Sequence, residues 1–131
     1  TTVERLKGQV NIWNVFTGLN TPGPLHLSDE QILRLAVTSI QTVRRADPRT
    51  PVIVTLDLPW AEYLGRKHDA VSPMHFADAL IRADLGLSGI ALEINLNYDP
   101  CGSLPRDLID ISDLIDQWSA LGGPLLIMLT S

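Results

Sequence analysis

The stretch PVIVTLD, residues 51–57, decides how this sequence folds. Its middle is a nearly unbroken run of apolar and β-branched residues, which is typical of a strand that is buried on both faces. Strands of this kind occur in parallel sheets, where helices connect one strand to the next and cover the sheet. We therefore predict a strand at residues 51–56 within a parallel sheet.

Three further apolar runs flank this stretch and predict strands at residues 9–16, 89–96 and 124–129. The starts of the four runs lie about 35 to 40 residues apart, a spacing that fits successive βα units. Connections between such units are right-handed, so the loops that follow the strands gather at one end of the sheet. Function normally lies at that end.

Helical patterns fill the segments between the runs. Ser28 and Gln31 have the spacing of a capping box before an apolar stripe, and Ser72-Pro73 predicts the start of a helix that reaches about residue 84. A third helix is predicted from Ser112 to Leu121, ending at two glycines. The first residues look like the end of another helix, with Lys and then Gly after Leu6.

These elements predict an α/β fold: a parallel (β/α) barrel segment with four strands and three helices of a TIM-type barrel, the helices packed on one side. A closed barrel needs roughly 200 residues or more. We therefore expect residues 1–131 to be one partial barrel domain and a fragment of a longer protein. The outer strands would be open edges, and Ile12, Ile53 and Ile127 are expected to face the missing half of the barrel. The expected partners are the rest of the barrel or a second copy bound through these edges.

Composition narrows the classes of function. The chain is 45% hydrophobic and carries a formal net charge of −5, with scattered basic residues, which argues against a nucleic-acid partner. No apolar run is long enough to predict a membrane span. Cys101 is the only cysteine, and neither a zinc-type spacing nor a dinucleotide-binding glycine loop is present. We expect neither a metal nor a cofactor, and the sequence does not indicate a compartment.

Three of the runs resemble family 10 glycoside hydrolases, the endo-1,4-β-xylanases. The segments WNVFTG (13–18), GIALEIN (89–95) and GPLLI (123–127) are similar to the family's strands four, six and seven. A second likeness is to xylanase-like proteins with a Pro-Trp-Gly-Glu-Tyr stretch after strand five and an Arg-Asp-Leu stretch before helix six. The counterparts here are PWAEY (59–63) and RDL (106–108).

The resemblance implies a carbohydrate ligand, but it also marks a departure from the family's chemistry. Retaining glycosidases need two carboxyl groups, one as acid/base and one as nucleophile. Gly18 stands at the acid/base position, and the nucleophile position falls on Leu129 or Ser131, depending on the alignment. The resemblance therefore implies a family 10 domain without its usual catalytic Glu pair.

The candidate site residues lie at or just beyond the predicted strand ends. Asp57 and Glu93 are the carboxylates nearest to a catalytic role, although Glu93 would equally suit a structural pair with a barrel Arg or Lys. Amides can bind sugar hydroxyls, and an exposed indole can stack on a sugar ring, although Trp60 would equally serve as a hydrophobic lid. The expected substrate-binding set is Asn14, Asp57, Trp60, Glu93 and Asn95.

Three functions follow from these observations. The first is a carbohydrate-active domain without the usual Glu pair, which binds polysaccharide or hydrolyses it by an altered route. The second is an active, xylanase-like O-glycosyl hydrolase that uses other carboxylates, such as Asp57 and Glu93. The third is a non-catalytic barrel kept as a structural or interaction module. Fold alone does not choose among them.

Overall fold

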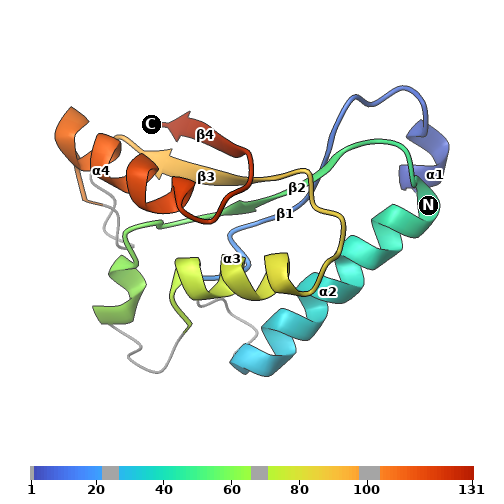
Figure 1. Ribbon diagram of the computed structural model, residues 1–131, viewed down its shortest axis with the longest axis horizontal. Coiled ribbons are helices and arrows are strands. Elements are labelled where there is room, and N and C mark those ends of the chain that lie inside the picture. The colour runs from blue at the N-terminus through green and yellow to red at the C-terminus, as the bar shows by residue number, and fades with distance from the viewer. Residues whose placement is uncertain (1, 22–26, 66–70, 98–103) are drawn as a thin grey trace.

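The computed structural model describes residues 2–21, 27–65, 71–97 and 104–131. The elements follow one another as α1 (Thr2–Leu6), β1 (Trp13–Thr17), α2 (Asp29–Ala46), β2 (Val52–Leu56), the 3-10 helix η1 (Glu62–Gly65), α3 (Pro73–Arg82), β3 (Gly89–Asn95), α4 (Leu108–Ser119) and β4 (Leu125–Thr130). The strands form one parallel sheet in the order β1-β2-β3-β4. This alternation confirms the predicted segment of a TIM-type (β/α) barrel (Figure 1).

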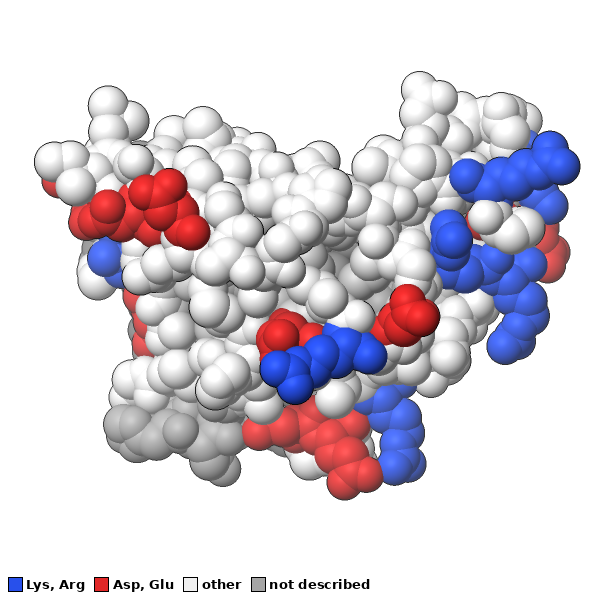
Figure 2. Space-filling view, viewed as in Figure 1, with Lys and Arg blue, Asp and Glu red and all other residues white. Residues whose placement is uncertain are grey.

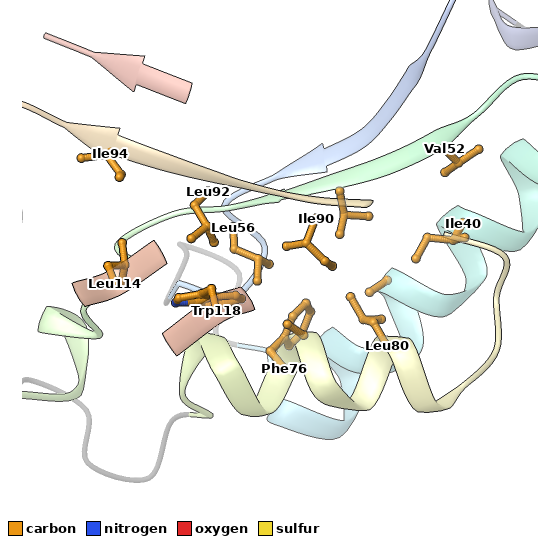
Figure 3. Close-up of a cluster of buried hydrophobic side chains, with 13 residues drawn as sticks. Ile40, Val52, Leu56, Phe76, Leu80, Ile90, Leu92, Ile94, Leu114 and Trp118 are labelled. Atoms are coloured by element: carbon orange, nitrogen blue, oxygen red, sulfur yellow. The ribbon is translucent and has the colours of Figure 1, made fainter. Parts of the chain in front are cut away.

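Helices α2, α3 and α4 cover one face of the sheet, as predicted (Figure 1). Side chains from β2 and β3 point toward this layer and meet apolar side chains from the three helices (Figure 3). Trp118 of α4 is 2% exposed and lies among them. The members of this cluster on the central strands are Val52, Val54, Leu56, Ile90, Leu92 and Ile94.

The opposite face of the sheet has no helical cover among the described residues. Ile53 and Thr55 of β2 are nevertheless buried. Their partners on β3 are the small residues Gly89 and Ala91, which leave room for side chains of β4 to cover them. Met128 of β4 reaches across Ala91 to Thr55, with 3.7 Å between its sulfur and the Thr55 hydroxyl. Small residues on β3 therefore let β4 side chains lie flat over the sheet.

The prediction that Ile127 faces the missing half of the barrel is wrong. Ile127 packs against the helix-side core, and its neighbours Leu126 and Met128 point to the open face instead. The side-chain period of two fixes this assignment, because β4 pairs with β3 without interruption and Leu92 is opposite Ile127. Ile53 lies on the open face as predicted, and Ile12 precedes β1.

A bulge interrupts the pairing of β1 with β2. Asn14 pairs with Ile53, but Thr17 pairs with Thr55, so β1 contains one extra residue. Asn14 and Thr17 consequently share the open face, while Val15 and Phe16 both pack toward the helices. The ring of Phe16 meets Phe76 of α3 edge-on at 6.3 Å.

The predicted start of the third helix is wrong by one turn. Helix α4 begins at Leu108 rather than Ser112, because Asp107 is its N-cap and forms a capping box with Asp110. Aspartate at the third helical position replaces the Glu or Gln of the usual pattern, which hid the cap from the sequence pattern. Strand β1 begins at Trp13 instead of residue 9, and η1 was not predicted.

Asp47 ties the end of α2 to the start of β1. Its carboxylate accepts hydrogen bonds from the Thr50 hydroxyl at 2.6 Å and from the Trp13 indole at 3.0 Å. These bonds lower the pKa of Asp47 from 3.8 to about 2. Trp13 is thus held by its nitrogen while its ring packs partly against the core.

The lowered pKa of Asp47 predicts an acid-sensitive contribution to stability. A depressed carboxyl pKa stabilises the fold fully above pH 3.8, and this contribution is lost as the pH falls through about 2. Substitution Asp47→Asn should lower stability at pH 7 and flatten the pH dependence between about 4 and 2. Urea unfolding followed at pH 7, 4, 3 and 2 measures this. An Asp47→Asn protein with the wild-type pH profile would contradict it.

Trp118 is expected to be the most sensitive core position on α4. Trp118→Ala should lower the free energy of unfolding by about 3 to 5 kcal/mol, because it empties a large buried volume. Ile109 lies on the same helix and is 71% exposed, so Ile109→Ala should change it by about 0.5 kcal/mol or less. Chemical denaturation of both variants tests the difference, which should vanish if Trp118 is not in the core.

Candidate functional site

Polar side chains line the open face of the sheet where the strands end. Because the strands are parallel, their carboxyl ends lie at one edge, toward the left in Figure 1. The pairing places these residues on the open face, in the order of the strands: Thr17, Asp57, Glu93 with Asn95, and Thr130. This row of hydroxyl, carboxyl and amide groups is the candidate functional site.

Asn14 joins the row through the bulge in β1. Its side-chain amide donates a hydrogen bond to the Thr17 hydroxyl at 3.2 Å, and both residues are exposed. Without the extra residue in β1, Asn14 and Thr17 would point to opposite faces of the sheet. The bulge therefore brings a predicted residue, Asn14, beside Thr17, which sequence reasoning did not select.

Asp57 and Glu93 are neighbours across β2 and β3. Leu56 pairs with Leu92, so the next residue on each strand, Asp57 and Glu93, occupies the next position of the same register. Adjacent strands are about 4.8 Å apart, which sets the distance between the two backbones. The register thus places the two candidate carboxylates side by side on the open face, and their shared role in a cleft stays a prediction.

Asn20 fixes the backbone at Asp57. Its side-chain amide donates to the Asp57 carbonyl at 2.9 Å and its amide oxygen accepts from the Asp57 N–H at 3.0 Å. Asn20 is buried, so these two bonds replace the water that would otherwise satisfy its amide. The Asp57 carboxylate in turn accepts from the Leu58 N–H at 2.7 Å. Asn20 thus joins the segment that follows β1 to the end of β2.

Tyr63 holds the far end of the loop that follows β2. Its hydroxyl donates to the Val71 carbonyl at 2.6 Å. Burial raises the pKa of the Tyr63 hydroxyl, and a hydrogen bond with the Asn20 side chain opposes this effect. The hydroxyl therefore keeps its proton at neutral pH and acts as a structural donor.

The end of β3 and the whole of β4 complete the row. The Asn95 side-chain oxygen accepts a hydrogen bond from the Asn97 N–H at 2.9 Å. Asn95 pairs with Thr130 on β4. The residues of β4 are Leu125, Leu126, Ile127, Met128, Leu129 and Thr130, so this strand carries no carboxylate in any alignment.

Trp60 lies apart from the other predicted residues. It packs partly against the helix-side core, and the Arg106 guanidinium lies 4.6 Å from the centre of its ring. Arg106 also forms an ion pair with Glu62 at 3.1 Å. These contacts occupy Trp60 with protein groups, and they agree better with a lid on the core than with a sugar platform. Sequence reasoning noted both motifs but did not pair them.

Charge is unevenly distributed among the described residues. In the view of Figure 2, acidic side chains gather over α4, basic ones gather over α1 and the end of α2, and both signs occur between them. Described carboxylates near the strand ends include those of Asp29, Glu30, Asp57, Glu62, Glu93, Asp107 and Asp110. Among the described residues, these groups disfavour an anionic ligand at the strand ends.

Other features of the described residues do not add chemistry to this edge. No group of three or more His, Cys, Asp or Glu residues there could hold a metal ion. A cavity of about 160 Å³ lies at the opposite end, lined mainly by apolar side chains including Leu87, Trp118 and Leu125. Within the same ranges, no helix is both long and apolar enough to cross a membrane.

Comparison with solved structures identifies the fold. A thermostable mutant of a xylanase from Cellvibrio japonicus superposes on the whole chain with a TM-score of 0.66 and 13% identity. A GH10 xylanase from Thermobacillus composti gives 0.61 and 18% over 94% of the chain. Xylanase 10B from Thermotoga petrophila, solved with xylobiose, gives 0.58 and 14% over 95%.

The likeness concerns the fold and part of each xylanase. The chain spans 40%, 34% and 36% of these three xylanase chains, respectively. No family model and no curated protein matches it. At these identities the shared property is the (β/α) architecture. The chain thus has the fold of a segment of a GH10 xylanase barrel.

Gly18 provides a test of the strand-end geometry. Its φ of +72° is left-handed, and a Cβ there would lie 3.5 Å from the Asp57 Cβ, an ordinary contact. Both Gly18→Ala and Gly18→Glu should therefore lose about 1 to 2 kcal/mol of stability from the backbone alone. Glu should lose more, because its charge approaches Asp57, and it should not create xylanase activity. Chemical denaturation and a xylan assay measure both, and a Glu variant as stable as wild type would contradict the geometry.

Proposed function

We propose that this chain is part of a family 10-like carbohydrate-active domain that binds a neutral polysaccharide at the strand ends and lacks the usual catalytic Glu pair. The observation that carries the proposal is the polar row on the open face of a xylanase-like sheet. Residues 1–131 form one partial barrel domain of a longer protein, whose other strands cover the exposed side chains of Leu126 and Met128.

The proposed binding groups suit sugar hydroxyls. Asn14 and Asn95 offer amide donors and acceptors, while the carboxylates of Asp57 and Glu93 accept hydrogen bonds from hydroxyl groups. The Thermotoga petrophila xylanase was solved in complex with xylobiose, which supports a carbohydrate ligand for a chain of the same fold. The acidic strand ends favour an uncharged chain such as xylan or a β-glucan.

The family's retaining route is proposed to be lost. Gly18 can neither protonate a leaving oxygen nor later accept a proton, and general acid–base catalysis contributes about 10²- to 10⁴-fold. Leu129 and Ser131 supply no nucleophile for a glycosyl intermediate, and β4 holds no carboxylate. Two possibilities remain: the protein binds a glycan without hydrolysing it, or it hydrolyses the glycan with other side chains.

The pairing of Asp57 with Glu93 favours one alternative, an O-glycosyl hydrolase that uses these two carboxylates. Strands about 4.8 Å apart place them close to the separation of about 5 to 5.5 Å found in retaining enzymes. Inverting enzymes need about 6.5 to 9.5 Å, with room for a water molecule. Hydrolysis by this pair would therefore depend on how the two side chains diverge.

Binding and hydrolysis can be separated in the intact protein with two conservative variants. Calorimetric titration with xylo-oligosaccharides and β-gluco-oligosaccharides should show binding that Glu93→Gln and Asp57→Asn each weaken about tenfold, since each removes a hydrogen bond to a charged group. Asp113→Asn, on the exposed surface of α4, is the matched control and should bind normally. Reducing-sugar release should be absent.

Each other outcome selects a different function. Hydrolysis abolished by both substitutions would establish the alternative hydrolase. Hydrolysis that survives both, with retained anomeric configuration, would show that another carboxylate pair exists. Absence of binding to every glycan would leave a structural or interaction module.

A further inference from the structure

Trp60, Glu62 and Arg106 form a cluster that the polar row does not include. Glu62 begins η1 after β2, and Arg106 directly precedes the N-cap of α4, so the two residues are 44 positions apart in sequence. Their ion pair is 3.1 Å long, and the side chains are only 11% and 22% exposed. The guanidinium also lies 4.6 Å from the Trp60 ring centre. Two strand-end segments are thus joined through one arginine.

The ion pair is half formed. Within the described residues, Glu62 Oε2 and Arg106 Nε are buried and have no hydrogen-bond partner. Arginine binds a carboxylate most strongly through two parallel bonds, and here only one nitrogen and one oxygen are engaged. The two unpaired atoms, a donor and an acceptor, belong to the same ion pair. The pair is therefore single-bonded.

The loop between β2 and Glu62 contains two residues with a strained backbone. Leu58 and Ala61 both have left-handed φ, at 47° and 65°, which costs side-chain-bearing residues energy. The Ala61 N–H closes a turn onto the Leu58 carbonyl at 2.8 Å. Leu58 also donates to the Asp57 carboxylate at 2.7 Å. Strain of this kind persists only when surrounding contacts hold the loop.

We infer that Glu62, Arg106 and Trp60 are a latch that positions the Asp57 carboxylate for glycan binding. The ion pair anchors the loop at Glu62, the strained turn transmits that position to Leu58, and the Leu58 N–H orients the carboxylate. Trp60 serves to seat the guanidinium rather than to stack on sugar. The latch rests on the proposed function, and Glu62 and Arg106 are positioning residues, since they act through Asp57.

A double-mutant cycle in the intact protein tests the latch. Glu62→Gln or Arg106→Gln alone leaves the partner's charge buried and unpaired, and should weaken oligosaccharide binding about tenfold, within the usual range for coupled residues. The double variant lacks the anchor altogether and should bind about as weakly as either single variant, so that the two losses do not add. Arg106→Lys should not rescue, because lysine keeps the charge but has no planar fork.

Two controls separate positioning from general destabilisation. Arg34→Gln breaks the Glu30–Arg34 pair, which is shorter at 2.7 Å but exposed at 80% and 77%, and should leave binding unchanged. Trp118→Ala lowers stability without touching the loop, and below its melting temperature it should bind like wild type. Single latch variants that bind as well as wild type would overturn the inference, and so would a double variant that binds like wild type or one whose loss is the sum of the two single losses.

Amide hydrogen exchange at Leu58 is read in parallel, without ligand. Exchange should be faster in each single variant and equally fast in the double variant, because the latch holds the bond from this N–H to Asp57. If the wild-type protein binds no glycan, the proposed function fails, and the exchange data still decide whether the latch exists. An unchanged Leu58 rate in both single variants would refute the latch whatever the glycan result.

Discussion

The parallel pairing of β2 with β3 is the constraint on which the rest of the structure depends. It aligns Val54 with Ile90 and Leu56 with Leu92, so one face of both strands is apolar and takes the helices. The same register places the alternate residues on the other face, and the last of them on each strand lie together at the carboxyl edge of the sheet. A shift of one position would bury the polar row and expose the core. The core and the candidate site therefore lie on opposite faces of the sheet, and the same register determines both.

Much of this arrangement follows from the sequence, and the exceptions have local causes. We could predict the central strand from its continuous apolar run. We could predict the helices after Ser28 and Ser72 because the capping residue and the helical spacing of apolar residues indicate the same start. The start of α4 was missed because Asp107 and Asp110 form an unusual capping box. The side on which Ile127 lies was also missed, because a strand with apolar residues on both faces carries no alternation to orient it.

The carboxylates of the candidate site could be predicted from the sequence, whereas the residues and contacts that support them could not. Asp57 and Glu93 stand at the ends of clear strands, so a shared face could be expected. Thr17 joins them only through the bulge in β1, which no periodicity reveals. The pairing of Glu62 with Arg106 joins residues 44 positions apart, and only the folded chain brings them together. Long-range polar contacts of this kind are invisible to a local pattern.

The uneven distribution of charge among the described residues would act on a charged ligand before the ligand makes any contact with the protein. With acidic groups gathered around α4, a polyuronate approaching the strand ends would meet repulsion before it could reach Asn14 or Asn95, whereas an uncharged glycan would not. At physiological salt this discrimination extends only about 8 Å, and it lengthens as the ionic strength falls. Under the proposed function, discrimination against anionic glycans would then depend on ionic strength and would be strongest in dilute solution.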